Sequence, residues 1–484
     1  MELKNLRRRQ FVKGSASALA LTSFPALKAL GQTGLEYRVE WRNFTGSRRT
    51  AFVNAIGSMR NNTNSSSPLS LQYWANIHRN SCPHGVPYFK AWHRGFLYYF
   101  ERALKAVAND ETMTIPYWDY YQYSTIPPEF NDPGSPLYMS RQNTNVYSAL
   151  SLTPFGSTLV NFPRGMSSAY EPSVEYKPHN AFHNVIGNTL ATMQSPLDPI
   201  FWLHHSQVDR LWVAWLNKGG GRQMPPASDA YWSGSFTYSG HSLQRIQTID
   251  TRTYLGYRYD NETAPTSLPS QTATSAAAKG AEDVALDKGV PPRPPLGKYK
   301  LSPPRDIAPG RRSIGGALNV NLGDTSLSVQ IPLSPADRRA LHALLDRLRQ
   351  PARNKPEASP YDSVKVVLDD LLVSGAGLQG GYFYNVYLNL PAGGGGEGSE
   401  PLYLLGGIGP FEIDGARHHR AHHNAHHHAT VQLGYEATLL LKESLSRDDR
   451  SITLSFVRVS GERTPRGRTI TICEARVELC AEGA

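Results

Sequence analysis

The residues His78-Arg79-Asn80-Ser81-Cys82-Pro83-His84, followed by His93, form the stretch of sequence on which the expected fold depends. A second stretch, about ninety residues further along, contains the other histidines of the first 205 residues: His179, His183, His204 and His205. Histidine is a common ligand of copper, zinc and iron, and imidazoles without thiolate or carboxylate partners suit a redox copper ion. We therefore expect each stretch to supply three imidazoles to one metal ion, with the two ions facing each other.

The residue types in the two stretches favour copper over other metals. Structural zinc is usually bound by thiolates, catalytic zinc normally has a carboxylate ligand or an open water position, and non-haem iron requires a carboxylate. Neither stretch has an acidic residue at a ligand-like spacing. A single buried histidine is more often an ordinary core residue, but that explanation does not extend to two patterned groups. Two copper ions are the favoured cofactor, and zinc is the alternative.

Apolar periodicity predicts helices around the first stretch. One helix is expected over 47–60, and a second is expected to open at Ser67-Pro68 and to end at His78. Two prolines and a glycine surround His84, so a loop must deliver that histidine. A third helix is expected to begin at His93 and to bury an apolar stripe.

The second stretch is also expected to be helical. His179 and His183 are spaced i, i+4 after Pro178, which places both on one face of a helix. Residues 200–216 form a further apolar helix that includes His204 and His205. Helices that each present an inward imidazole fit a bundle that holds a metal pair in its core.

The chain of 484 residues is longer than one hydrophobic core usually holds, so several domains are expected. We expect a multidomain α+β protein, with an α-helical bundle and dinuclear copper site over 32–262 and a β-sandwich-like domain over 312–484. A linker rich in Ala, Ser, Thr, Pro and Gly is expected over 263–311. In the last region one helix is expected over 334–349, and alternating segments predict strands at 318–322, 326–331, 382–390, 437–441, 452–459 and 469–472.

The first 31 residues have the pattern of a targeting segment. Arg7-Arg8-Arg9-Gln10-Phe11-Val12-Lys13 precedes a weakly apolar run, as in a twin-arginine export signal. The run is short and contains Pro25, so stable insertion in a membrane is not expected. A basic amphipathic start to the first domain is the alternative. The signal predicts that the export machinery carries the protein to the periplasm or the medium.

The net charge of +10 is spread along the chain as single Lys and Arg residues, without a basic helix face. Such a diffuse excess gives no support to nucleic-acid binding. The candidate metal stretches remain the only pattern with clear chemistry.

The part of the chain from residue 37 to residue 259 resembles the type 3 copper proteins, most closely the bacterial tyrosinases and related polyphenol oxidases. The resemblance rests on His84-Gly85, Trp92-His93-Arg94, Glu101-Arg102, Pro116-Tyr117-Trp118-Asp119, Pro178-His179-Asn180, His183, Asp198-Pro199-Ile200-Phe201-Trp202-Leu203-His204-His205, Asp209, Trp212 and Tyr257-Arg258-Tyr259. Together these motifs are highly specific.

The resemblance implies two copper ions and O2 as co-substrate. The first copper would be bound by His78, His84 and His93, although the spacing from His78 to His84 is shorter than in many relatives. The second would be bound by His179, His183 and His205. The side chains implied to pack around these ligands are Phe89, Phe201, His204 and Asp209. Cys82 matches a cysteine that forms a thioether with the histidine at His84 in some members, and a free buried thiol is the alternative.

The resemblance also implies an oxidoreductase for small phenols: ortho-hydroxylation of monophenols and oxidation of o-diphenols to o-quinones, as in melanin biosynthesis. A phenol has a pKa of about 10, so binding of a monophenol requires a base. In the family a glutamate and an asparagine hold a water for this step; Glu175, with Glu171 as a rival, and Asn180 match them. The alternatives are a catechol oxidase without hydroxylase activity and a hemocyanin-like oxygen carrier.

The β-rich region resembles, less specifically, the C-terminal domain that shields the copper pair of latent polyphenol oxidases. The match is loose and rests on Phe383-Tyr384-Asn385-Val386-Tyr387-Leu388. It implies that one side chain covers the copper site until this lid is displaced or cleaved off at the linker. Seven histidines at 418–428 lie in a loop-like stretch, where they either gather metal or form a solvated polar loop.

Overall fold

The computed structural model describes residues 34–270, 289–349, 359–396, 399–423 and 431–483. Helices dominate between residues 46 and 217, and antiparallel strands dominate from residue 300 onward. Both parts belong to one compact unit, Glu36–Ala484. The expected signal segment at 1–31 lies outside the described residues, so the twin-arginine assignment stays a prediction. Within the described ranges, none of the helices has the length and apolar character needed to span a bilayer.

The helices of the first part are α1 (Gly46–Asn61), α2 (Leu71–Ser81), α3 (Phe89–Ala108), α4 (Tyr170–Val174), α5 (Ala181–Ile186) and α6 (Ile200–Asn217). The expected opening of the second helix at Ser67-Pro68 is wrong by three residues, because Ser70 is the N-cap and its hydroxyl accepts the Gln72 N–H at 3.2 Å. The expected start of the third helix is also late. α3 begins at Phe89, so His93 lies in its second turn.

The segment that carries His179 and His183 has a kink at Lys177, just before Pro178. A π-helical segment, Glu175–Asn180, separates α4 from α5 and contains His179. Lys177 has an extended backbone before Pro178, as residues before proline prefer, and the Lys177–Pro178 peptide bond is cis. His183 lies in α5. Since Lys177 is the only residue of the segment with non-helical backbone angles, the helical backbone continues from Pro178 into α5. The expected i, i+4 placement of His179 and His183 after Pro178 agrees with this.

Two short strands join the beginning and end of the helical part. β1 (Glu36–Arg38) pairs in parallel with β4 (Tyr257–Tyr259). Between α6 and β4, β2 (Ser235–Tyr238) and β3 (His241–Gln244) form a hairpin over α3. Tyr238 donates its hydroxyl proton to the carbonyl of Trp92 at 2.8 Å. These contacts fix the residues that flank His93.

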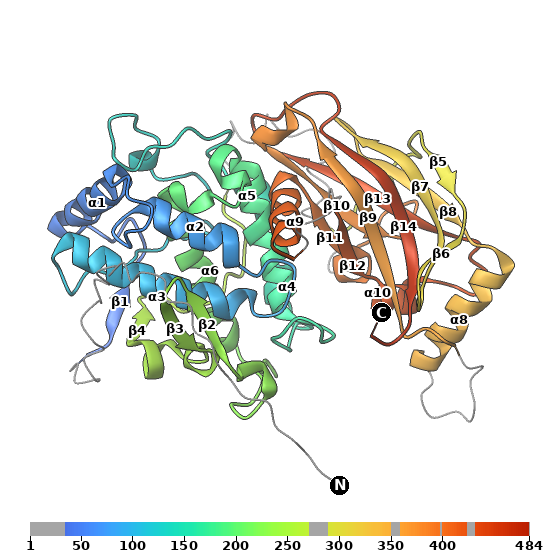
Figure 1. Ribbon diagram of the computed structural model, residues 1–484, viewed down its shortest axis with the longest axis horizontal. Helices are drawn as coiled ribbons and strands as arrows, with labels where there is room; N and C mark the ends of the chain where they lie inside the picture. Colours follow the sequence, from blue (N-terminus) through green and yellow to red (C-terminus); the bar gives the residue numbers. More distant parts are fainter. Residues whose placement is uncertain (1–33, 271–288, 350–358, 397–398, 424–430, 484) are drawn as a thin grey trace, which may run out of the picture. The chain divides into compact units, whose positions relative to one another are not determined.

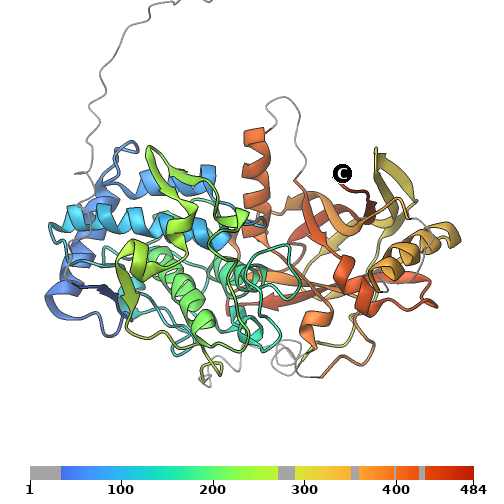
Figure 2. The ribbon, with the colours of Figure 1, turned by 90° about the horizontal axis from the view of Figure 1, so that it is seen from below.

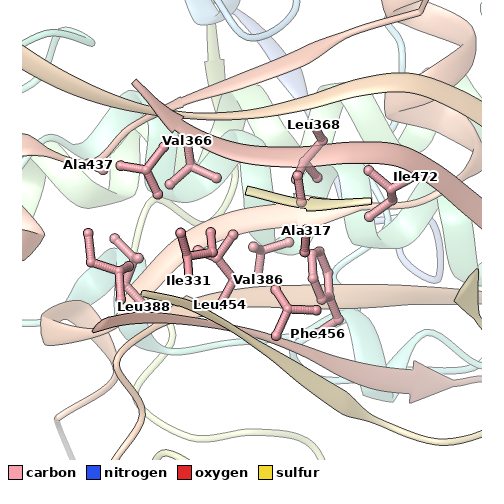
Figure 3. Packing of buried hydrophobic residues seen from close by; sticks show 14 of the residues in the cluster. Ala317, Ile331, Val366, Leu368, Val386, Leu388, Ala437, Leu454, Phe456 and Ile472 are labelled. Carbon is pink, nitrogen blue, oxygen red and sulfur yellow. The ribbon is translucent and has the colours of Figure 1, made fainter. Parts of the chain in front are cut away.

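The second part contains two antiparallel sheets packed face to face. One has the order β11 (Leu404–Ile408), β10 (Tyr382–Leu388), β13 (Ser451–Ser460), β8 (Leu327–Pro332); the other has β12 (Leu433–Glu436), β9 (Ser363–Val373), β14 (Ile470–Cys480), β7 (Arg311–Leu322), β5 (Lys300–Ser302), with β6 (Arg305–Ala308) paired to β7. Apolar side chains such as Ile331, Val386 and Phe456 from one sheet face Ala317, Val366, Leu368 and Ile472 from the other (Figure 3). The predicted β-sandwich-like architecture is confirmed.

Some expectations for this part differ from the structure. β5 and β6 lie inside the segment expected to be a linker, where they pair with β7. The strand expected at 437–441 is wrong, because Thr438–Ser444 forms the helix α10. The expected helix is present as α8 (Pro335–Arg349). The division of the chain at 31, 262 and 311 otherwise stays a prediction.

A further helix, α9 (Pro410–His423), follows β11 and lies between the two parts. It packs against α2 and α5 on one side and against β9, β11 and β12 on the other (Figure 2). It includes the first histidines of the 418–428 stretch, so the loop expected there is wrong as far as His423, where the helix ends. This helix brings the β-rich part next to the histidines of the helical part.

Candidate metal centre

The first group of candidate ligands gathers at the ends of α2 and α3 and in the loop between them. His78, His84 and His93, together with Cys82, offer donor atoms that all lie within 4.8 Å of one another. His78 and His93 are almost completely buried. We call these four residues the first cluster.

The second group lies on the π-helical segment, α5 and α6. His179, His183, His204 and His205 offer donor atoms within the same 4.8 Å limit, and all four are buried. We call these residues the second cluster. The two clusters face each other, because the His93 and His205 rings stack with centroids 4.6 Å apart and the His84 and His179 rings lie 5.5 Å apart.

Backbone carbonyls orient three of the imidazoles. The Nδ1 atoms of His78, His93 and His183 lie 2.9, 2.8 and 2.8 Å from the carbonyl oxygens of Met193, Phe89 and Leu190. Such a bond requires a proton on Nδ1 and leaves the Nε2 lone pair for a metal. The Nε2 atoms of His93 and His183 are buried and have no hydrogen-bond partner among the described residues. This is the donor geometry that a buried metal pair needs.

The electrostatics of the site keep the imidazoles neutral. Burial lowers the pKa of His183 to about 3, and burial together with neighbouring imidazoles holds the pKa values of His93, His179 and His205 well below the ordinary range. A neutral imidazole is the form that binds metal. The Nε2 atoms of His179 and His205 lie only 3.3 Å apart, as expected of two ligands that converge on one ion. The donor set therefore fits two copper ions.

The side chains expected to pack around the ligands are in place. Phe201 lies 4.0 Å from the His205 ring and 5.2 Å from the His78 ring, centroid to centroid. Phe89 lies 4.7 Å from the His93 ring and 4.5 Å from the His179 ring. Each phenylalanine thus contacts both clusters and fills the space between ligands.

His204 stacks on Phe182 with centroids 3.7 Å apart. One of its ring nitrogens also lies within 4.8 Å of the donor atoms of the other three histidines of the second cluster. Neither of its ring nitrogens has a hydrogen-bond partner among the described residues. The assignment of His205 rather than His204 as the ligand stays a proposal based on the family resemblance.

Asp209 ties the helices of the two clusters together. It accepts a hydrogen bond from Arg94 Nε at 2.6 Å and from the hydroxyls of Tyr257 and Tyr259, each at 2.7 Å. Burial alone would raise the pKa of Asp209, but the charges of Arg94 and Arg38 hold it below its ordinary value. Since Arg94 follows His93 and Asp209 lies one turn after His205, this ion pair sets the spacing of α3 and α6.

Cys82 is positioned for the expected crosslink. Its Sγ lies 2.8 Å from Nδ1 and 3.4 Å from Nε2 of His84, so it faces the ring carbon between these nitrogens. The thiol is buried, and burial raises its pKa well above the ordinary value. The thioether stays a proposal that this geometry supports.

The candidate water-holding residues have partners of their own. Glu175 accepts the Gly85 N–H and an Arg164 Nη2 hydrogen, both at 2.6 Å, so it lies beside the loop of His84. Its rival Glu171 accepts the N–H groups of Lys90 and Arg164 at 3.2 and 3.1 Å. Burial raises the pKa of Glu171 to about 7 and also raises that of Glu175.

Asn180 lies next to the second cluster. Its Oδ1 lies 2.8 Å from Nδ1 of His179, and its side chain hydrogen-bonds the carboxylate of Glu412 in α9. The role of Glu175 and Asn180 as a pair stays a proposal.

Phe411, in the first turn of α9, is the residue of the site that the sequence did not identify. Its ring stacks on His183 with centroids 4.1 Å apart and planes 5° apart, and it lies 5.2 Å from His84 and 5.8 Å from His179. It therefore touches both clusters and is buried. Gly409, Pro410 and Glu412 would have indicated a helix start there, with proline at the first position and an acid in the first turn.

The histidine-rich stretch lies at the other end of α9. The Nε2 of His418 is 3.6 Å from Oδ1 of Asp414, and its Nδ1 accepts from Arg79 at 3.5 Å. The side chains of the later histidines lie outside the described residues. The metal-gathering hypothesis for this stretch therefore stays untested.

Comparison with known proteins agrees with this geometry. The common central domain of tyrosinase matches residues 49–149 and 134–218. A tyrosinase from Hahella sp. (strain CCB-MM4) is 29% identical over 277 residues, which cover 46% of this chain and 59% of the relative. Catechol oxidase B from Solanum tuberosum is 30% identical over 213 residues, or 32% of this chain and 36% of the relative. The chain thus spans about a third to three fifths of these relatives.

The fold extends the likeness beyond the helical part. The structure of latent apple tyrosinase matches with a TM-score of 0.50 and 18% identity, covering 92% of this chain and 97% of that one. A latent aurone synthase matches with a TM-score of 0.50 and 17% identity over 94% of this chain and 91% of that one. These matches show a shared arrangement of helical and β-rich parts.

The helical bundle and its two facing imidazole clusters define a protein of the type 3 copper class. Within this class, the matched central domain and the relatives make the helical part of the chain similar to the tyrosinase family.

Proposed function

We propose that this protein is a copper-dependent tyrosinase, which hydroxylates small monophenols at the ortho position and oxidises o-diphenols to o-quinones with O2. The observation that supports it best is the pair of buried imidazole clusters, whose neutral rings face each other 4.6 Å apart at His93 and His205. Bound there, two copper ions would supply the electrons for O2 reduction that phenol oxidation requires. The first ion would be held by His78, His84 and His93, and the second by His179, His183 and His205.

Glu175 and Asn180 are proposed to handle the phenol proton. A carboxylate with a raised pKa suits a proton acceptor, because its driving force for taking a proton near neutral pH is larger. Glu175 is held by Gly85 beside His84, and Asn180 is held beside His179, so each of the two residues lies next to one of the clusters. This arrangement favours hydroxylase activity over a catechol oxidase.

The protein is further proposed to be latent while α9 covers the site. Phe411 occupies the space against His183 and His84 where the ring of a phenol would have to enter. Displacement of α9, or cleavage before the β-rich part, would open that space. The relatives solved as latent enzymes share this arrangement of parts. Export by the twin-arginine route, before or after activation, is part of the same proposal and rests on Arg7-Arg8-Arg9 and the apolar run.

The test is oxygen uptake by the copper-loaded protein with a monophenol and its matching o-diphenol, before and after mild proteolysis. Uptake with both substrates, faster after proteolysis, is the expected result. Uptake with the diphenol alone would make the protein a catechol oxidase. Reversible O2 binding without consumption of either substrate would support the oxygen carrier instead, and equal rates before and after removal of the β-rich part would contradict latency.

A further inference from the structure

The carbonyls that orient the imidazoles differ in what holds them. The carbonyl of Phe89 belongs to the same helix as His93, and that of Leu190 lies a few residues after His183. The carbonyl that orients His78 belongs to Met193, far along the chain, in an irregular segment between two short 3₁₀ turns. Its position therefore depends on whatever fixes that segment.

The residue that holds Met193 comes from the β-rich part. The N–H of Met193 donates to Oδ2 of Asp414, in α9, at 2.8 Å. The neighbouring amides of Thr192 and Ser195 bond locally, to carbonyls within the same turns. The Met193 side chain is buried and lies against α9 as well, since a Cβ at Gly415 would meet its methyl carbon at 3.4 Å. α9 thus holds both the backbone and the side chain of Met193.

We infer that Asp414 is a positioning residue for the first copper ion, acting through Met193 to hold the carbonyl that orients His78. The inference rests on the proposed dicopper site and gives the β-rich part a second role. Besides covering the centre with Phe411, it stabilises the ligand geometry of the copper ion bound by His78.

The physical reason lies in the partner of the non-ligating ring nitrogen. A carbonyl bonded to that nitrogen fixes the tautomer and the orientation of the ring, and loss of such a partner typically costs 10–100-fold in metal affinity. The bond from the Met193 N–H to Asp414 is charge-assisted and therefore stronger than a bond to a neutral acceptor. Because Asp414 acts one residue further from the ring, we expect an effect near the low end of that range.

Another role for Asp414 is a local contact within α9. Among the described residues, Asp414 also contacts His418, four residues along the helix, with Nε2 3.6 Å from Oδ1. If that contact were the only function of Asp414, removal of His418 would have the same effect as removal of Asp414. His418→Ala is therefore the matched control.

The test measures copper affinity at equilibrium, by competition with a chelator, in the full-length protein and its variants. We expect Asp414→Ala to bind the first copper ion about tenfold less tightly. Asp414→Asn, whose amide oxygen still accepts a hydrogen bond, should bind it a few-fold less tightly. His418→Ala should match the wild type. During the titration, Asp414→Ala should accumulate half-loaded chains, visible by electron paramagnetic resonance because a lone Cu(II) gives a signal and a coupled pair does not.

Phe411→Ala controls for general loosening of α9, because it removes a contact of this helix with the centre but leaves Met193 untouched. Equal loss of affinity in Phe411→Ala and Asp414→Ala would overturn the inference, as would wild-type affinity and spectra in Asp414→Ala. If the wild type and Asp414→Ala both take up two copper ions equally well, only the positioning role of Asp414 is refuted. A wild-type protein that binds no copper pair would refute the proposed function together with it.

Discussion

The two sides of the imidazole centre are built from different kinds of contact. On the side of α2, α3 and α6, called here the core side, aromatic rings pack closely around the buried Arg94–Asp209 pair, as between Phe100 and Trp202, whose planes are 5° apart. On the side of α9, called here the cover side, hydrogen bonds predominate. Asn184 accepts the Phe411 N–H at 2.9 Å and donates to Glu412 at 2.8 Å. Phe411 is the ring that the cover side places against the histidines.

This difference indicates which side can open. A contact made of buried apolar surface behaves like a domain core, whereas a polar contact between parts of a chain resembles the interface of a transient complex. Water can replace the hydrogen bonds of the cover side at little net cost, but it cannot replace the packing of the core side. We therefore expect substitutions on the core side to abolish the metal centre. Substitutions that weaken closure on the cover side should open the centre to substrate.

The largest effect is expected for a ligand of the second copper. His183→Ala removes an imidazole whose Nδ1 is fixed by Leu190, and it leaves the second copper ion with only two of its three proposed ligands, His179 and His205. Copper content should fall from two ions per chain toward one. Oxygen uptake should drop by more than about a hundredfold, because losing a ligand costs more than losing the hydrogen-bond partner of a ligand. His241→Ala, on β3 outside both clusters, is the control. Two retained copper ions in His183→Ala would contradict the assignment.

The next effect concerns the proposed base. Glu175→Gln keeps an oxygen that can accept the Gly85 N–H but loses the negative charge, so proton removal from a monophenol should slow by roughly a hundredfold. Oxidation of the o-diphenol should change far less, since it does not depend on the same base. The ratio of the two rates, measured by oxygen uptake, separates this from a general loss of structure. Glu171→Gln is the control, and a larger effect there would transfer the role to Glu171.

The site of the core side could largely be predicted from the sequence, and that of the cover side could not. The spacing of the histidines indicates two metal-binding groups, and the structure gathers both, whereas the choice of His205 over His204 as a ligand rests on the family resemblance and stays a proposal. Phe411 becomes part of the centre only because α9 docks against α2 and α5, and no local pattern encodes a contact between residues more than two hundred positions apart. The run of histidines after it also suggested a polar loop, although α9 continues as a helix to His423.

A third prediction tests the ring of the cover side. Phe411→Ala should raise the activity of the full-length protein toward the o-diphenol by at least about tenfold, because loss of a stacked, buried ring weakens closure by more than 1.4 kcal/mol. Tyr176→Phe is the control, since it removes the hydrogen bond to Asn385 between the same two parts but leaves the ring over the copper site in place. Activation of both variants to the same extent would mean that any weakening of the interface opens the site. No activation of Phe411→Ala would show that Phe411 is not the barrier.

The smallest effect should appear in the pH dependence of closure. Burial raises the pKa of Glu412 above its ordinary value when α9 is docked, whereas an undocked α9 would expose the carboxyl and restore that value. Between the ordinary and the raised pKa of Glu412, the docked state binds more protons than the undocked state. The contribution of Glu412 to closure is therefore fully present below this pH window and is lost as the pH rises through it. Tyr176, Tyr382 and Tyr435 face Glu412, but burial raises their pKa values above the ordinary phenol value, so they stay neutral there.

The measurement is the rate of the full-length protein divided by the rate of Phe411→Ala, as a function of pH. This ratio should rise a few-fold with pH, and Glu412→Gln should flatten it. A ratio that falls as the pH rises, or one that Glu412→Gln leaves unchanged, would assign the pH dependence to another group.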